Sequence, residues 1–159
     1  MKKILLLSIL LWTGWVSAQA IDLDKENRDP KYVESIVSRS QKIVDKLGIN
    51  DAKVAEDVRN VIANRYFTLN DIYETRDAKV KEIKESDLVG EAKNNALKAA
   101  EDAKDAALYR IHFAFPADLS LFLTEEQIEA VKDGMTYGVL KITLSLIHIS
   151  EPTRLRRIS

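Results

Sequence analysis

Two stretches of the sequence combine side chains that could bind a ligand. The first is Tyr109-Arg110-Ile111-His112-Phe113, in which an imidazole lies near a guanidinium and an aromatic ring. An imidazole can bind a ligand or transfer a proton near neutral pH. A histidine without a second histidine at helical spacing is, however, weak evidence for a metal. The pattern therefore favours a structural role for His112. The alternatives are ligand binding, together with Arg110, or proton transfer, and we predict no metal site.

The second stretch is Asp133-Gly134-Met135-Thr136-Tyr137-Gly138, where two glycines four residues apart flank a polar aromatic side chain. It follows a predicted helix end, and loops held by a rigid scaffold are where binding groups concentrate. Such a loop can direct Thr136 and Tyr137 into a cleft, with Asp133 beside them. The simpler interpretation is a helix end followed by a turn. The candidate ligand-binding residues are thus Asp133, Thr136, Tyr137, His112 and Arg110.

No set of residues dictates a reaction. The sequence has no cysteine, which excludes cysteine nucleophiles, disulfides and thiolate zinc sites. Carboxylates are abundant but dispersed along predicted helix faces, so no acid–base pair can be chosen. Asp51, Glu56 and Asp57 suit the positive end of a helix dipole. We predict no catalytic residue and no cofactor; an enzyme acting on a sugar or its ester stays open if sequence beyond Thr143 supplies the carboxylates.

Aromatic side chains give limited support for a sugar-binding surface. Stacking on the C–H faces of a sugar needs exposed rings. Both tryptophans, Trp12 and Trp15, lie near the N-terminus. We expect the remaining rings to belong mainly to the core, in particular Tyr66-Phe67, Tyr73 and Phe113-Ala114-Phe115.

Residues 1–20 have the features of a cleavable secretory signal. Lys2 and Lys3 precede an apolar run that is too short to span a membrane comfortably, and Ala18-Gln19-Ala20 supplies a small-x-small cleavage site. We predict cleavage after Ala20, with cleavage after Ala18 or an uncleaved signal anchor as alternatives. Neither cleavage product begins with the cysteine that a lipid anchor needs. We therefore predict a periplasmic or secreted protein with no stable membrane anchor.

Residues 144–159 break the pattern that precedes them. From Leu144 to Arg154 the sequence reads, codon by codon, as the in-frame translation of a common transposase sequencing-library adapter, and a sample index with fixed sequence accounts for the rest. We interpret this segment as a non-native, adapter-derived tail, so the domain is C-terminally truncated and its natural sequence stops at about Thr143. A native strand with a basic tail is the alternative.

Without these two ends the protein is acidic. The 24 Lys and Arg fall to 19 and the 25 Asp and Glu fall to 24, so residues 21–143 have a net charge of −5, whereas the full sequence has −1. A nucleic-acid-binding protein needs a basic surface. We therefore exclude nucleic acid as a partner, while the oligomeric state stays open.

Residues 21–143 predict the N-terminal portion of an all-α domain. A polar, flexible lead-in over residues 21–29 ends in Asp29-Pro30, which suits an N-cap followed by proline at the first helical position. Apolar residues at helical spacing then predict a helix to Leu47, closed by Gly48.

Two further helices and a capping box follow. Asn50 is the predicted cap of a long second helix that ends near Ser86, with Ile49 and Val54 as a hydrophobic staple. An alanine-rich third helix runs from about Ser86 until Pro116 breaks or kinks it.

Thr124 and Gln127 then form a capping box, with Leu123 and Ile128 as its staple, and a short fourth helix reaches Asp133 before Gly134. We expect a helical hairpin of the second and third helices, with the two shorter ones packed on it as a bundle.

Several of these segments together resemble one family. The segments are Lys42 to Gly48, the 58–77 helix, Leu123 to Gln127 and Val131 to Val139, of which the Asp-Gly-Met-Thr-Tyr-Gly stretch is the most specific. They are similar to domain-of-unknown-function family thirty-eight twenty-six (DUF3826), secreted proteins of polysaccharide-degrading bacteria. The resemblance implies sugar binding, with no established catalytic residue and with further sequence after Thr143.

Two functions follow as hypotheses from different classes. The leading one is an exported accessory protein of a polysaccharide-utilisation system that binds a glycan, and it depends mainly on the resemblance. The alternative is a periplasmic stress adaptor or chaperone-like hairpin, because the Leu-Thr-x-x-Gln pattern at residues 123–127 resembles helical extracytoplasmic chaperones.

Overall fold

The computed structural model describes residues 20–136, and these residues are all-α. Five helices occur in this range: α1 (Pro30–Val44), α2 (Ala52–Glu85), α3 (Gly90–His112), α4 (Ala114–Leu119) and α5 (Glu125–Met135). None of residues 20–136 forms a strand. Residues 1–19 of the predicted signal segment, Tyr137 and the predicted adapter-derived tail lie outside the described residues.

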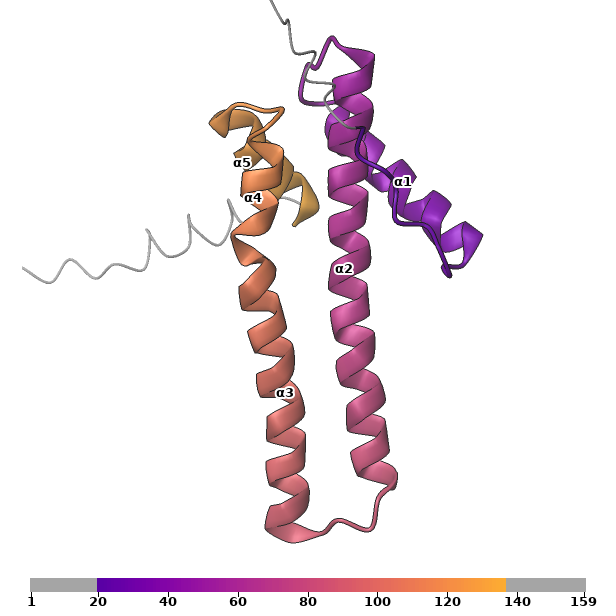
Figure 1. Ribbon diagram of the computed structural model, residues 1–159, viewed down its shortest axis with the longest axis vertical. Helices are drawn as coiled ribbons and strands as arrows, with labels where there is room; N and C mark the ends of the chain where they lie inside the picture. Colours follow the sequence, from indigo (N-terminus) through magenta and orange to yellow (C-terminus); the bar gives the residue numbers. More distant parts are fainter. Residues whose placement is uncertain (1–19, 137–159) are drawn as a thin grey trace, which may run out of the picture.

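The architecture is the predicted helical hairpin with shorter helices at one end. The helices α2 and α3 run side by side in opposite directions along the long axis of the molecule (Figure 1). The short helices α1, α4 and α5 gather at the end that contains the start of α2 and the end of α3 (Figure 1). The hairpin turn, residues 86–89, lies at the opposite end.

The start of α1 agrees with the sequence, whereas its end comes earlier than predicted. The Asp29 carboxylate accepts a hydrogen bond from the Tyr32 amide at 2.9 Å, and Pro30 is the first helical residue. The helix ends at Val44, not Leu47, and a tighter turn follows in which the Leu47 amide donates to the Val44 carbonyl. Gly48 has a φ of +66°, the left-handed conformation expected of a glycine that ends such a turn.

The N-cap of α2 is Asp51, one residue after the predicted Asn50. The Asp51 carboxylate accepts from the Lys53 and Val54 amides at 2.8 and 3.1 Å. A carboxylate satisfies the free amides as an asparagine would and adds a favourable interaction with the helix dipole. The helix ends at Glu85 with Ser86 as C-cap, as predicted.

The break in the third helix lies upstream of the proline that causes it. The ring of a helical proline clashes with the carbonyl four residues earlier, which for Pro116 is that of His112. The helix α3 ends at His112, Phe113 forms a turn, and α4 starts at Ala114 with Pro116 in its first turn. The helix also starts later than predicted, because Gly90, with a φ of +56°, ends the exposed turn after Ser86.

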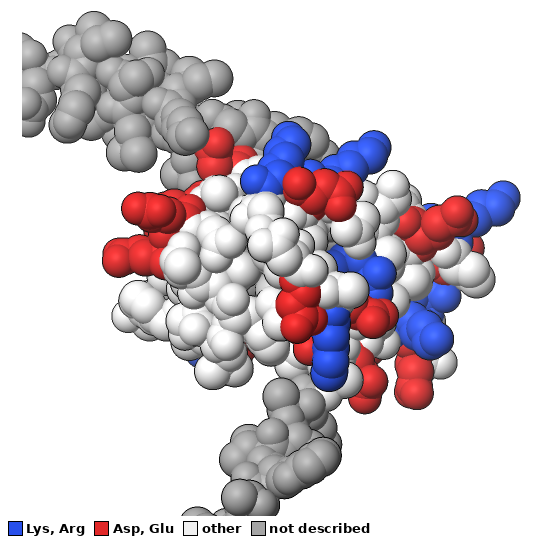
Figure 2. Space-filling model, turned by 90° about the horizontal axis from the view of Figure 1, so that it is seen from above, with Lys and Arg blue, Asp and Glu red and all other residues white. Residues whose placement is uncertain are grey.

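The core is concentrated at the end where the short helices meet the hairpin. Val58 and Ile62 of α2, Leu119 of α4 and Val131 of α5 have no exposed surface and belong to one apolar cluster. Ile43 and Val44 complete this cluster from α1. Seen from this end, uncharged side chains form a continuous area, with acidic side chains along its left edge and a mixture of acidic and basic side chains to its right (Figure 2).

The capping box at the start of α5 is confirmed and has an additional contact. Thr124 and Gln127 make both reciprocal hydrogen bonds, and Leu123 and Ile128 are buried. The Gln127 amide also donates to the Leu47 carbonyl at 2.9 Å, which ties α5 to the turn after α1.

The predicted helix stop at Gly134 is wrong. The helix α5 continues through Gly134 to Met135, and Thr136 is its C-cap. A Cβ atom at position 134 would lie 3.2 Å from Cγ1 and 3.3 Å from Cγ2 of Ile43, closer than ordinary van der Waals contact. The glycine therefore allows α5 to pack closely on α1, and it does not reverse the chain.

Candidate functional site

Three ring side chains project from the last turns of α3. Tyr109 and Phe113 are 69% and 65% exposed, and their centroids lie 5.9 Å apart in an edge-to-face arrangement. The exposed His112 ring lies 4.8 Å from that of Phe113, also edge to face. We call Tyr109, His112 and Phe113 the aromatic cluster. Residues four apart on a helix share a face, which explains how Tyr109 and Phe113 meet.

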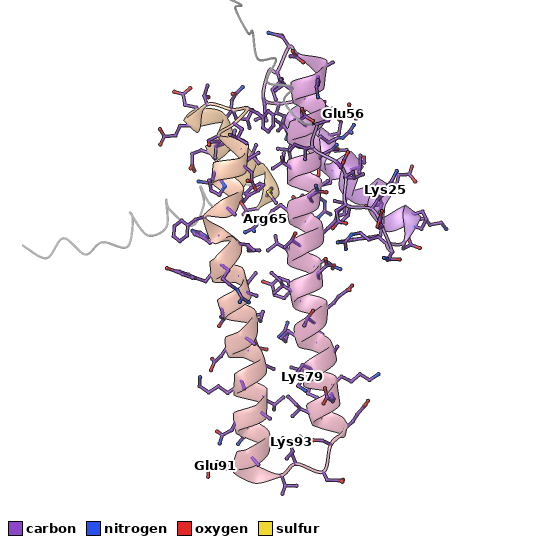
Figure 3. All side chains as sticks on the ribbon, viewed as in Figure 1. Lys25, Glu56, Arg65, Lys79, Glu91 and Lys93 are labelled. Atoms are coloured by element: carbon purple, nitrogen blue, oxygen red, sulfur yellow. The ribbon has the colours of Figure 1, made fainter. Side chains whose placement is uncertain are left out.

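Arg65 holds the end of α3 that bears this cluster. Its side chain extends from α2 toward α3 (Figure 3), and its guanidinium donates from Nη1 to the Ile111 carbonyl at 3.0 Å. The guanidinium carbon also lies 5.4 Å from the centre of the Phe115 ring. Burial lowers the pKa of Arg65 from its usual value, with a smaller opposing contribution from the Asp118 carboxylate.

A second candidate surface is the groove between α2 and α3, with a volume of about 670 Å³. Alanines line its α3 side at positions 100, 103 and 107, and small side chains let another polypeptide approach the backbone closely. Arg76, Lys104 and Arg110 bring charged groups to its margins. We call it the interhelical groove.

The charges at the groove are joined into a network. The Glu101 carboxylate accepts from Lys104 Nζ at 2.8 Å and from Arg76 Nη1 at 2.6 Å. The hydrogen bonds from Lys104 and, next, from Arg76 lower the pKa of Glu101 below its usual value. Glu101 therefore stays ionised and holds both cations in place beside the apolar floor.

The predicted site residues fall on two different elements. Arg110 lines the interhelical groove, and His112 lies on the surface at the end of the same helix. Asp133 and Thr136 instead lie at the end of α5, whose Gly134 packs against α1. Thr136 is exposed, and its hydroxyl lies 3.1 Å from the carbonyls of Lys132 and Asp133.

The sequence interpretation of this second stretch as a loop is thus incorrect up to Met135, because the last turn of α5 includes Asp133 and Gly134. Tyr137, the aromatic member of the predicted set, lies outside the described residues.

The aromatic residues expected in the core divide into two groups. Phe67 and Phe115 are buried as predicted, and Tyr66 is half-buried. Tyr73 is 43% exposed and Phe113 is largely exposed, so the core prediction is wrong for both. Phe113 occupies the turn that Pro116 forces between α3 and α4, and this turn places its ring in solvent.

The segment before α1 is fixed to α2, a feature that sequence reasoning missed. The Ile21 amide donates to Asp57 Oδ1 at 2.9 Å, and Asn60 Nδ2 donates to the Ile21 carbonyl at 2.7 Å. Asn64 Nδ2 donates to the Asp22 carbonyl, and Asn64 Oδ1 accepts from the Asp24 amide, both at 2.8 Å. The predicted flexible lead-in is thus an ordered strip along one face of α2, which we call the N-terminal strip.

A salt bridge fixes the other end of the N-terminal strip. The Arg28 guanidinium donates to both oxygens of Asp71 at 2.7 and 2.8 Å and lies 4.6 Å from the centre of the Phe67 ring. The hydrogen bond from Arg28 lowers the pKa of Asp71, more than its partial burial raises it.

The sequence contains a signal for this strip. Asp57, Asn60, Asn64 and Asp71 recur at helical spacing on one side of α2, and Asp57 and Asn60 are buried. Buried polar side chains require partners, so a polar stripe on a long helix predicts that a segment of backbone covers it. The helix-dipole explanation of Asp57 is therefore incomplete, because its carboxylate binds the strip.

Residues 20–136 contain no group of three or more His, Asp or Glu side chains placed to hold a metal ion. No helix within this range combines the length and apolar character needed to cross a membrane.

Comparison with models of protein families identifies a match over most of the helical region. A family model described as "Protein of unknown function (DUF3826)" matches residues 33–150, most of the sequence. Its range covers α1 to α5 almost completely and ends within residues 144–159, the predicted adapter-derived segment. No curated protein matches the sequence.

Proposed function

The chain belongs to the DUF3826 family, and from this premise we propose that it is an exported helical accessory protein that binds carbohydrate through the aromatic cluster on α3. The observation that supports this proposal is the exposure of Tyr109 and Phe113 side by side at the end of a fixed helix. Large rings left in solvent are a common feature of binding surfaces.

The chemistry of the cluster suits a sugar. The C–H faces of a pyranose stack on aromatic rings, and its hydroxyls bind nearby polar groups. Tyr109 offers such a ring together with a hydroxyl, and His112 offers a ring nitrogen. Arg110 is exposed on the same turn of α3 and has five N–H donors for the hydroxyls.

Calorimetric titration of the full-length protein with soluble plant and host glycans tests this proposal. We expect Tyr109→Ala to weaken binding of the best glycan at least tenfold, because the substitution removes the stacking ring. Tyr73→Ala is the matched control: it removes another exposed tyrosine, on α2, and should leave the affinity unchanged. Absence of binding to every glycan, or equal affinity of the Tyr109→Ala variant and the wild type, would overturn the proposal.

The interhelical groove favours a second candidate function, in which the hairpin binds an unfolded or helical polypeptide. Its alanine floor and paired charges at the margins suit an amphipathic segment, which presents apolar residues on one side and polar residues on the other.

Suppression of client aggregation, followed by light scattering, tests this second function. Ala103→Leu should fill the groove and abolish suppression, whereas Ala106→Leu, at an exposed alanine outside the groove lining, should not. Equal loss in both variants, or no suppression by the wild type, would exclude it.

A further inference from the structure

The buried carboxylate of Asp57 lies where the polypeptide would begin after export processing. Asp57 is only 4% exposed, and its Oδ1 lies 2.9 Å from the backbone nitrogen of Ile21. Its other oxygen lies 3.5 Å from Nζ of Lys53, whose side chain is 59% exposed. A buried carboxylate needs stronger compensation than one backbone amide and a distant, solvated ammonium group provide.

We propose that the α-ammonium group of Ile21, created by cleavage of the Ala20–Ile21 bond, forms an ion pair with the Asp57 carboxylate in the mature protein. This ion pair, which we call the lock, holds the start of the N-terminal strip on α2. This proposal rests on the export that the proposed function includes, but it does not depend on carbohydrate binding.

The chemistry requires a signal peptidase and one water molecule. The hydroxyl of the water adds to the carbonyl carbon of Ala20, the C–N bond to Ile21 breaks, and the nitrogen leaves as an amine. At neutral pH the new carboxyl group of Ala20 releases a proton and the amine takes one up. An α-amino group has a pKa of about 7.7–8.0 in model peptides, so the new terminus of the mature protein is a cation.

The charge change strengthens a contact that already has the required geometry. Before cleavage the Ile21 nitrogen is a neutral amide with one hydrogen; afterwards it has three hydrogens and a positive charge. The hydrogen bond to the carboxylate then also gains the attraction between two opposite charges, which is strong where little water screens it. The Asn60 side chain holds the Ile21 carbonyl at 2.7 Å, which keeps the nitrogen beside the carboxylate.

The register of the N-terminal strip distinguishes between the two predicted cleavage sites. The hydrogen bonds from α2 hold Ile21, Asp22 and Asp24, and the Ile21 side chain packs on the core cluster, whereas Ala20 is exposed. Cleavage after Ala18 would leave Gln19 and Ala20 attached, so the atom beside Asp57 would remain a neutral amide. The structure thus favours cleavage after Ala20.

Thermal unfolding of three otherwise identical proteins tests the lock. The first begins at Ile21 with a free amine, the second at Ile21 with an acetylated amine, and the third at Gln19. We expect the first to unfold several degrees higher than the other two. Asp57→Asn should lower the midpoint of the first protein much more than that of the acetylated one, because only the free terminus forms an ion pair.

Asp71→Asn is the control, because it weakens the other end of the strip and should lower all three midpoints equally. Equal midpoints of the three wild-type proteins would overturn the proposal, as would an Asp57→Asn effect that is independent of the terminus.

A second measurement does not depend on the folding of any variant. Mass spectrometry of the protein recovered after export should give Ile21 as the first residue, and a mature protein that begins at Gln19 would contradict the proposal. A protein that passes both tests but binds no glycan leaves the lock in place and removes only the proposed function.

Discussion

Arg65, in the middle of α2, donates a hydrogen bond to the carbonyl of Ile111 at 3.0 Å, next to the break between α3 and α4. The continuous helix of the hairpin therefore supports the interrupted one where a proline disturbs its hydrogen bonding. An arginine can satisfy a carbonyl at a helix C-terminus and also interacts favourably with the dipole there.

Replacement of Arg65 should destabilise the protein measurably. Arg65→Ala removes a charged hydrogen bond and the contact with the Phe115 ring, so we expect a loss of about 1.5–3 kcal/mol in the free energy of unfolding. Urea unfolding followed by circular dichroism measures it. Lys79→Ala is the control, because its exposed pair with Glu82 should contribute only about 0.2–1 kcal/mol. Equal effects of both substitutions would contradict this role of Arg65.

The close packing at Gly134 predicts a non-additive pair of substitutions. Gly134→Ala should be destabilising despite the better helix propensity of alanine, because the new methyl group meets the buried side chain of Ile43. Overpacking of this kind costs about 1–3 kcal/mol.

Ile43→Ala alone should cost about 2–5 kcal/mol. In the Gly134→Ala background it should cost less, since the methyl group then enters the space that Ile43 leaves. Chemical unfolding of the four proteins measures the coupling, and strict additivity would show that the two sites do not compete for space.

The middle of the N-terminal strip should loosen when Asn64 is replaced, while the bonds of Asp57, Asn60 and Asp71 still hold its two ends. Asn64→Ala removes two hydrogen bonds to backbone groups of Asp22 and Asp24, and each contributes about 0.5–1.5 kcal/mol. Hydrogen exchange of the Asp24 amide should become much faster, while that of amides within α3 should stay unchanged. Thr75→Ala is the control, because the Thr75 hydroxyl bonds only the backbone of its own helix among the described contacts.

The ion pair between Arg28 and Asp71 predicts a loss of stability in acid. Because the pKa of Asp71 is lower in the folded protein than in the unfolded state, the pair stabilises the fold above the unfolded pKa of about 3.9. This contribution is lost as the pH falls below that value through the folded pKa. The Asp71 side chain is half-exposed, so we expect only about 0.2–1 kcal/mol.

The free energy of unfolding, measured with urea between pH 6 and pH 2, should therefore fall less steeply for Asp71→Asn than for the wild type below about pH 4. Parallel curves would show that Asp71 has the same pKa in both states.

The features that the sequence predicted correctly depend on local signals. Asp29-Pro30 and the pair of Thr124 and Gln127 act through hydrogen bonds within a few residues, so their positions alone locate two helix starts. The long apolar stripe of α2 and the alanines of α3 likewise predicted the hairpin, because helical spacing directly determines which residues share a face.

The features that the sequence predicted incorrectly depend on contacts between distant residues. Gly134 has the signature of a helix stop, and only its approach to Ile43 explains why the helix continues. The polar composition of residues 21–29 suggests flexibility, whereas the partners of that segment lie about forty residues later on α2. The outward position of Phe113 follows from a break whose location depends on Pro116.

The uneven distribution of the core has a mechanical consequence. The large apolar cluster occupies one end of the hairpin, whereas the buried side chains of the distal arms, within the described residues, are few, chiefly Ile83 and Ala100. Segments with sparse apolar contacts open at lower free energy. The distal parts of α2 and α3 should therefore open at lower free energy than the end of the hairpin that contains the large apolar cluster. A ligand bound in the interhelical groove would contact both helices and raise the free energy needed to separate them.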